Sequence, residues 1–231
     1  MPSEDDQRLI AALDAWLDAR PAPADRSEEA AALRDLLLHV RPGPRQALAL
    51  GLVREADGWR DRPAVSLWGG RDPVRLHDLA RRRFGEAAEI KPLASPEDAL
   101  AAVAGSAVAV LALDGERPWW GRLLARPRLK VLAALPELSP QGPTAALVVG
   151  EGEVGPSGQD ETFWVTDDPG RRAAIEDALS QLGAAARLVE EAGGLKLFSL
   201  AGYFQSHDER LLRAPGRLTG VIGWAPLPFD L

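Results

Sequence analysis

Residues 63–113 read PAVSLWGGRDPVRLHDLARRRFGEAAEIKPLASPEDALAAVAGSAVAVLAL, and this stretch decides the fold. Three short apolar runs in it have the composition of strands, and the last one is apolar without a break, which is typical of a strand buried on both faces. The segment 74–84 and the segment that opens with Ser95-Pro96-Glu97-Asp98 have helical patterns and helix-starting residues. Strands that alternate with helices predict a parallel α/β lobe. We expect its strands at residues 64–68, 88–90, 107–113, 129–135 and 145–149.

The flanking segments have other patterns. Residues 1–61 contain three short amphipathic helices, which have little core of their own and are expected to pack on something larger or on a second copy. A Gly-, Pro- and Ser-rich linker at 150–159 precedes the order strand–helix–strand–strand–helix–strand, which predicts a ferredoxin-like module. The predicted fold class is therefore α/β (α+β overall), with a short N-terminal helical segment (1–61), a single three-layer α/β lobe with parallel strands (62–150) and a C-terminal ferredoxin-like module (151–231).

Composition excludes several kinds of chemistry. The chain has 231 residues, of which 46% are hydrophobic and 26% charged, the balance of an ordinary globular protein. It has no Cys, which excludes disulfide frameworks, thiol nucleophiles, iron–sulfur clusters and zinc fingers. The three histidines, His39, His77 and His207, do not stand at ligand spacing. We therefore expect no metal site and no other cofactor.

Charge and hydropathy bear on partners and location. A net charge of −7 argues against nucleic acid as a partner. No apolar run approaches the ~18 residues of a membrane span. The opening MPSEDDQ is acidic, unlike a signal peptide. The sequence thus predicts a cytoplasmic protein that binds neither nucleic acid nor membrane.

Several motifs, taken in order, resemble one family. Residues 155–162, GPSGQDET, followed by TDDPG at 166–170, are similar to the start of the regulatory ACT module of prephenate dehydratases. Gly85 and the run from Ser95 to Val103 are similar to that enzyme's Phe-Gly and Ser-x-Glu-Asp-x-x-x-Ala-Val patterns, and Thr144 stands where it carries Thr-Arg-Phe. With the helical segment in front, the chain resembles the fused chorismate mutase–prephenate dehydratase proteins of phenylalanine biosynthesis, in a degenerate form with an ACT-like C-terminal module.

The sequence departs from the family at the polar motifs. The mutase's first helix carries two Arg and a Lys, but here that helix stops at Pro21, and in the family's Asp-x-x-Arg-Glu motif Asp25 is followed by Glu28 and Glu29. Thr144 lacks its neighbouring Arg, and the dehydratase's second lobe is missing. The ACT module's Glu-Ser-Arg-Pro motif is replaced by Glu-Glu-Ala-Gly at 190–193. The resemblance still implies a homodimer, and an effector contact at Asp168, Pro169 and Gly170.

A ligand site is predicted at one edge of the α/β sheet. Loops at the carboxyl ends of parallel strands bind ligands in such sheets, and helix N-termini favour anions. Arg71 follows the first strand and Asp114 the third, and both are expected at this edge with Trp119. These positions also have purely structural explanations. Asp72, beside Arg71, can cap a helix, and Trp119 can be a core residue. Thr144 can simply begin a strand, and residues 167–170 can form a plain turn. The candidate ligand-binding residues are Arg71, Asp114, Trp119 and Thr144.

Three functions follow from these observations. The preferred hypothesis is a catalytically degenerate protein that binds a small aromatic or cyclic carboxylic acid, as a sensor or regulatory subunit. The first alternative is an active chorismate mutase or prephenate dehydratase completed by dimerisation, with catalytic residues that the sequence does not identify. The second is a scaffold or partner-binding subunit without a ligand.

Overall fold

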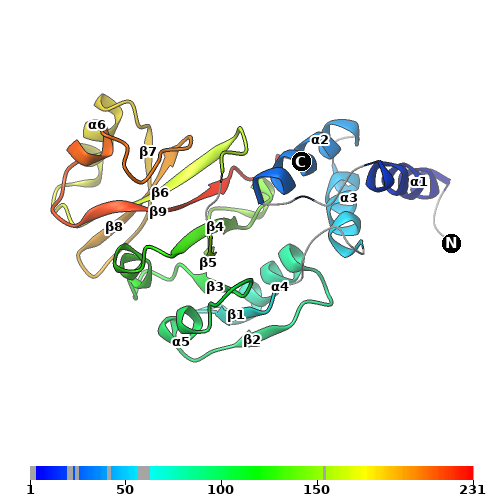
Figure 1. The fold of residues 1–231 in the computed structure, drawn as a ribbon, viewed down its shortest axis with the longest axis horizontal. Coiled ribbons are helices and arrows are strands. Elements are labelled where there is room, and N and C mark those ends of the chain that lie inside the picture. The colour runs from blue at the N-terminus through cyan, green and yellow to red at the C-terminus, as the bar shows by residue number, and fades with distance from the viewer. Residues whose placement is uncertain are drawn as a thin grey trace.

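A computed structural model describes residues 4–19, 23, 26–40, 43–56, 63–152 and 155–230. Helices gather at the N-terminal end, and one mixed sheet runs through the rest of the molecule (Figure 1). In these residues the helices are α1 Glu4–Asp18, α2 Arg26–His39, α3 Pro44–Glu55, α4 Pro73–Phe84, α5 Pro96–Ala101 and α6 Arg172–Gln181, with short 3-10 helices η1 Trp119–Ala125, η2 Ser139–Gln141 and η3 Leu211–Arg213. The strands are β1 Val65–Trp68, β2 Ile90–Pro92, β3 Val108–Ala112, β4 Leu129–Leu135, β5 Ala146–Glu151, β6 Asp160–Thr166, β7 Ala186–Ala192, β8 Leu195–Ala201 and β9 Thr219–Pro226.

The sheet has the order β2-β1-β3-β5-β4-β9-β6-β8-β7. The α/β class predicted from the sequence is confirmed, and β2, β1 and β3 are parallel as expected. The next two strands differ from the parallel expectation, because β5 lies antiparallel to both β3 and β4. No α-helix connects β4 to β5, and a connection without a crossover helix favours an antiparallel pair.

The C-terminal strands continue the same sheet. Their order, β9-β6-β8-β7, is that of a ferredoxin-like module, with the short η3 where the second helix is expected. The sheet is continuous through a parallel pairing of Val131 in β4 with Gly223 in β9. Gly223 has φ +147°, and a Cβ there would lie 2.3 Å from the backbone nitrogen of Val131, so this close approach requires glycine.

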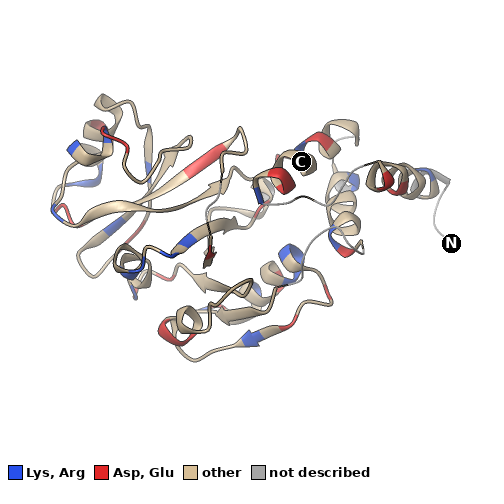
Figure 2. Ribbon diagram, viewed as in Figure 1, with Lys and Arg blue, Asp and Glu red and all other residues tan. Residues whose placement is uncertain are grey.

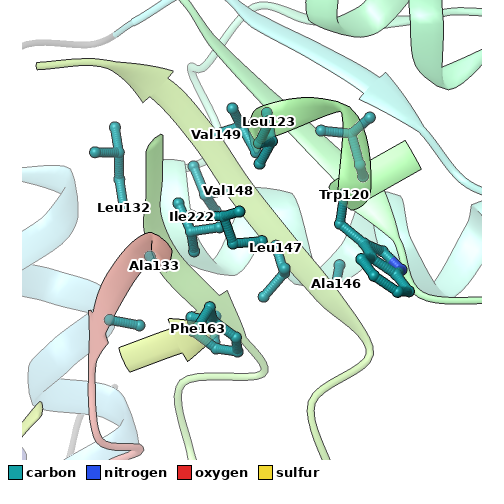
Figure 3. Packing of buried hydrophobic residues seen from close by; sticks show 14 of the residues in the cluster. Trp120, Leu123, Leu132, Ala133, Ala146, Leu147, Val148, Val149, Phe163 and Ile222 are labelled. Atoms are coloured by element: carbon teal, nitrogen blue, oxygen red, sulfur yellow. The ribbon is translucent and has the colours of Figure 1, made fainter. Parts of the chain in front are cut away.

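One apolar core spans this pairing. Trp120 and Leu123 of η1 pack beside β5, and Phe163 of β6 and Ile222 of β9 reach the same cluster (Figure 3). Trp119, a candidate ligand-binding residue, is also a core residue, with 1% of its surface exposed and its indole Nε1 donating to the Ala112 carbonyl at 2.7 Å. The α/β lobe and the C-terminal module therefore bury side chains in common.

The helical segment packs against the chain's own C-terminal end. Phe229, beyond β9, lies in the cluster formed by Leu13, Leu33 and Leu50 of the three helices. Ser27 donates its hydroxyl to the Gly155 carbonyl at 2.5 Å, and Arg34 binds the same linker. The apolar faces of the three helices thus pack in part against other segments of the same chain. Among the described residues no helix is both long enough and apolar enough to cross a membrane.

Candidate functional site

The predicted edge of the sheet contains a cavity. Arg71 and Asp114 both line a space of about 290 Å³, together with Arg75 and Ala145. Asp72 accepts a hydrogen bond from the Arg75 backbone at 3.0 Å and so caps α4. The structure therefore brings together two of the four candidate residues. We call this space the carboxyl-edge cavity.

The charged side chains that line the carboxyl-edge cavity balance, with two arginines against two aspartates. The Arg71 guanidinium contacts Glu116 at 2.5 Å, and this contact raises the pKa of Arg71 above its ordinary value. Asp114 accepts from the backbone of Glu116 at 3.1 Å. Glu190 of β7 accepts from the backbone of Gly115 and, at 2.7 Å, from the Trp120 indole. Burial raises the pKa of Glu190, and the charge of Asp114 raises it further. An anionic ligand would therefore find no excess of positive charge in this cavity.

Thr144 lies in a different cavity, of about 330 Å³, with Glu161, Arg187 and Ser199. Glu161 is 3% exposed, and its Oε1 has no hydrogen-bond partner in the described part of the chain, while Ser199 donates its hydroxyl to Oε2. Arg187 lies 3.8 Å from Oε2. Burial raises the pKa of Glu161, because removing the charged form from water is costly.

The candidate effector residues form a closed turn before α6. Asp168 accepts from the Gly170 backbone at 2.7 Å, and its own backbone N–H donates to the Thr166 hydroxyl at 3.1 Å. Lys196 donates to the Asp168 carbonyl at 2.7 Å. These contacts explain why the TDDPG sequence forms a turn. They do not test the effector contact at Asp168, Pro169 and Gly170, which stays a prediction.

A larger cavity lies between the α/β lobe and the C-terminal module. It measures about 650 Å³ and opens beside β4 and β9, and we call it the junction cavity. Ligand pockets for small molecules fall in the range of ~300–1,000 Å³. Its lining residues are Pro127, Arg128, Lys130, Glu151, Gly152, Gly155, Tyr203, Gln205, Ser206, His207 and Trp224.

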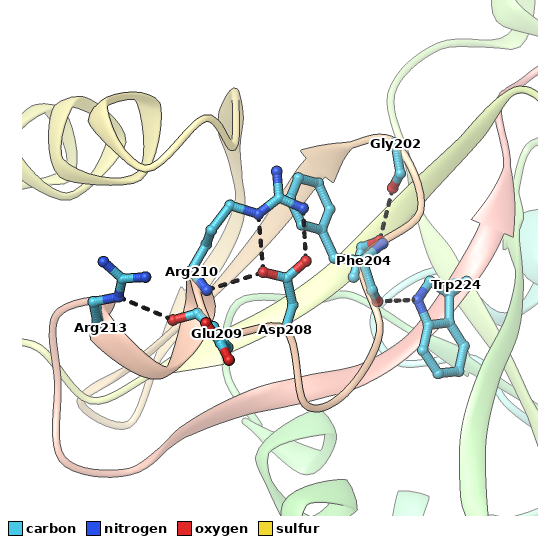
Figure 4. Close-up of polar contacts among 8 residues, drawn as sticks. Gly202, Phe204, Asp208, Glu209, Arg210, Arg213 and Trp224 are labelled. Carbon is cyan, nitrogen blue, oxygen red and sulfur yellow. Dashed lines mark hydrogen bonds and ion pairs between the residues drawn. The ribbon is translucent and has the colours of Figure 1, made fainter.

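Aromatic rings form one wall of the junction cavity. Tyr203 stacks on Trp224, with ring centroids 5.1 Å apart and an interplanar angle of 21°. The Lys130 ammonium lies 5.8 Å from the centre of the Trp224 ring, within the range of a cation–π contact. The Trp224 indole donates to the Phe204 carbonyl at 2.7 Å, which fixes the ring (Figure 4).

The loop that follows β8 holds this wall in place. Thr162 of β6 donates its hydroxyl to the Gly202 carbonyl and accepts from the Phe204 backbone, at 2.7 and 2.9 Å. Further along the loop, Arg210 lies over the Phe204 ring at 4.6 Å and pairs with Asp208 through two contacts of 2.9 and 2.6 Å (Figure 4). The Arg210 guanidinium lowers the pKa of Asp208. These contacts tie the loop to β6 and to the Phe204 ring.

The junction cavity is locally basic in an acidic chain. Charges of both signs are spread over the ribbon, and Lys and Arg stand at the start of β4 (Figure 2). Arg128 and Lys130 line the cavity with one carboxylate, Glu151, which accepts from the Gly105 backbone at 3.1 Å. A concave basic surface on a protein of net charge −7 attracts anions.

Sequence reasoning missed this cavity because its residues come from distant parts of the chain. Only the pairing of β4 with β9 brings Lys130 to Trp224. The available signals were weak: the single Tyr in the chain, and a Trp in the last strand. Among the described residues no group of three or more acidic, His or Cys side chains is placed to hold a metal ion.

Comparisons with known proteins give distant matches in fold. No family model and no curated protein sequence matches the chain. A solved structure described as "GqqA- a novel type of quorum quenching acylases" has 17% identity and a TM-score of 0.46, over 70% of this chain and 94% of that one. A prephenate dehydratase from Streptococcus mutans has 15% identity and a TM-score of 0.39, over 72% of this chain and 100% of that one. Similarity this distant concerns the fold alone, and no residue role or activity passes to this chain.

Proposed function

We propose that this chain binds a small aromatic carboxylic acid in the junction cavity and acts as a sensor or regulatory subunit. The observation that carries the proposal is the stacked Tyr203–Trp224 pair beside Lys130 and Arg128. A planar ring stacks favourably on such a wall, by about 0.5–1.5 kcal/mol beyond its buried area. A carboxylate on the same ligand reaches the two cationic side chains. The cavity volume of about 650 Å³ leaves room for a one-ring acid and its water.

Two features favour binding over the mutase or dehydratase activity that the resemblance implies. Glu29, which falls at the position of the mutase glutamate, is held by Arg83 in a two-point ion pair of 2.7 and 2.7 Å. Asp25, at the neighbouring motif position, lies outside the described residues. Thr144 lines a different cavity from Arg71 and Asp114, so these candidates do not form one catalytic group.

One observation favours an enzyme instead. The Thr144 cavity holds Glu161, whose raised pKa and unpartnered Oε1 suit a proton donor in an elimination reaction. Incubation with prephenate tests this alternative through the release of phenylpyruvate. Turnover that disappears in Glu161→Gln and persists in Lys130→Met would support the enzyme and contradict the sensor.

The test of the proposed function is a thermal-shift screen with chorismate, prephenate, phenylpyruvate and the three aromatic amino acids. At a few tens of dissociation constants a ligand adds about 2 kcal/mol to the free energy of unfolding, which the screen detects. We expect at least one acid to stabilise the chain, and Lys130→Met to remove the effect. Arg71→Ala is the control and keeps it. No shift with any acid would favour the scaffold alternative, and loss in Arg71→Ala alone would move the site to the carboxyl edge.

We also propose a homodimer. The described helices α2 and α3 leave Leu38, Leu48 and Leu52 exposed, Leu38 at 85% of its surface, although the chain covers their other faces. Light scattering at high protein concentration measures the mass directly. A monomeric mass would contradict this part of the proposal.

A further inference from the structure

Five charged side chains meet where the helical segment, the α/β lobe and the C-terminal end of the chain come together. Arg26 and Glu29 come from α2, Arg54 from α3 and Arg83 from α4, and Glu137 follows β4. Arg83 is 5% exposed, Glu29 6% and Arg54 7%, so the cluster is largely removed from water. We call this group the buried arginine cluster.

The two carboxylates of the cluster are engaged by two of the three arginines. Arg83 holds both oxygens of Glu29 at 2.7 Å, and its Nε lies 2.9 Å from Glu137. The other oxygen of Glu137 accepts from Arg54 at 2.5 Å. Three guanidinium groups thus share two carboxylates. Among the residues that the structure describes, one positive charge has no matching carboxylate within the cluster.

Arg26 is the arginine of the cluster that makes no ion pair with Glu29 or Glu137. Its Nη1 is shut off from solvent and has no hydrogen-bond partner among the described residues, although Arg26 as a whole is only half-buried. Burial and the nearby charge of Arg83 lower the pKa of Arg26 to about 10, which leaves the side chain protonated at neutral pH. A donor of a charged group that is shut off from water and makes no hydrogen bond is unfavourable. This arrangement therefore calls for a further negative group.

A small cavity lies beside this unpartnered group. It measures about 20 Å³, and its wall includes Arg26, Arg83, Leu33, Ala133 and Phe229. A space of this size holds about one water molecule or an atom of similar size. It excludes phosphate, sulfate and any organic acid.

We propose that the cavity binds a single small monovalent anion of the size of chloride, held by Nη1 of Arg26. A cation is disfavoured, because Glu29 and Glu137 already pair with Arg83 and Arg54 and the cluster has an excess of positive charge. The anion neutralises this excess where α2 meets β4 and the segment after β9, and so fastens the helical segment to the rest of the molecule. This site is separate from the junction cavity and does not depend on the proposed function.

The test compares thermal unfolding of the full chain in sodium chloride and in sodium gluconate at the same ionic strength. Equal ionic strength equalises screening, and gluconate is too large for the cavity. At about ten dissociation constants of chloride we expect a midpoint about 3 °C higher than in gluconate. Arg26→Gln, which keeps a polar side chain and removes the charge, loses this difference. Arg213→Gln, at an exposed position in η3, keeps it.

Anomalous diffraction from wild-type crystals soaked in bromide is the second measurement, and it does not require the variant to fold. A bromide peak beside Nη1 of Arg26 supports the proposal. An equal salt response in the wild type and in both variants, or a crystal in which this cavity holds water after the soak, overturns it.

Discussion

The carboxyl-edge cavity and the junction cavity differ in the charges that surround them. At the carboxyl edge, Arg71 pairs with Glu116, and Asp114 lies near the buried carboxyl of Glu190. At the junction, Arg128 and Lys130 stand beside stacked aromatic rings. The first cavity has the place in the topology where α/β sheets bind ligands, and the second has the chemistry that suits an aromatic anion. The topology of the sheet indicates where a ligand can bind, and the charges of the neighbouring side chains determine which ligand is favoured there.

The largest expected effect comes from two tryptophans: Trp224, which lines the junction cavity, and Trp119, which is buried in the core and lines neither cavity. Trp224→Ala and Trp119→Ala each remove a buried indole, and each should lower the free energy of unfolding by about 3–5 kcal/mol. Denaturant unfolding measures both. The ligand-induced thermal shift separates them, because Trp224→Ala loses it and Trp119→Ala keeps it. The reverse pattern would contradict binding at the junction cavity.

A smaller effect is expected from Lys130→Met, which keeps the apolar stem of the side chain and removes its charge. Loss of a charged hydrogen bond to the ligand carboxylate should weaken binding by about 1.5–3 kcal/mol. Calorimetric titration with the acid found in the thermal-shift screen measures the dissociation constant. The matched control is Lys91→Met, since Lys91 is exposed in β2, away from the junction cavity. An unchanged affinity in Lys130→Met would contradict a contact between Lys130 and the ligand carboxylate.

Glu190 gives a pH-dependent prediction for the carboxyl edge. Because burial raises its pKa in the folded state, folding favours the protonated form. Its contribution to stability is therefore highest at acid pH and falls as pH rises from the unfolded pKa through the raised folded pKa. Glu190→Gln, which resembles the neutral form, should gain stability relative to the wild type over this window. A difference between the two proteins that is constant with pH would contradict the raised pKa.

The smallest effect is expected from Arg71→Ala. The side chain is exposed and pairs with an exposed Glu116, so its removal should leave the free energy of unfolding nearly unchanged. Ligand affinity should also stay the same, as measured in the titration used for Lys130→Met. A marked loss of affinity would restore the carboxyl edge as the binding site.

The sequence predicted features that depend on neighbouring residues. Local sequence pattern predicts the buried strand β3 and the cap of α4 at Asp72. The rule for parallel strands predicts that Arg71 and Asp114 lie at the same edge of the sheet. Features that depend on long-range pairing were missed. The junction cavity requires β4 to lie beside β9, and the core position of Trp119 depends on which strands cover η1. No periodicity in the chain carries this information.

The most direct test of the central claim uses the indole N–H signals of the seven tryptophans in ¹⁵N nuclear magnetic resonance spectra. Trp224 is assigned by its absence in Trp224→Phe, and Trp68, at the carboxyl end of β1, by its absence in Trp68→Phe. Each of the six acids in the thermal-shift screen is titrated in turn. We expect the Trp224 signal to shift saturably with at least one acid while the Trp68 signal does not shift. Movement of Trp68 with Trp224 unchanged, or no movement of either signal, would contradict it.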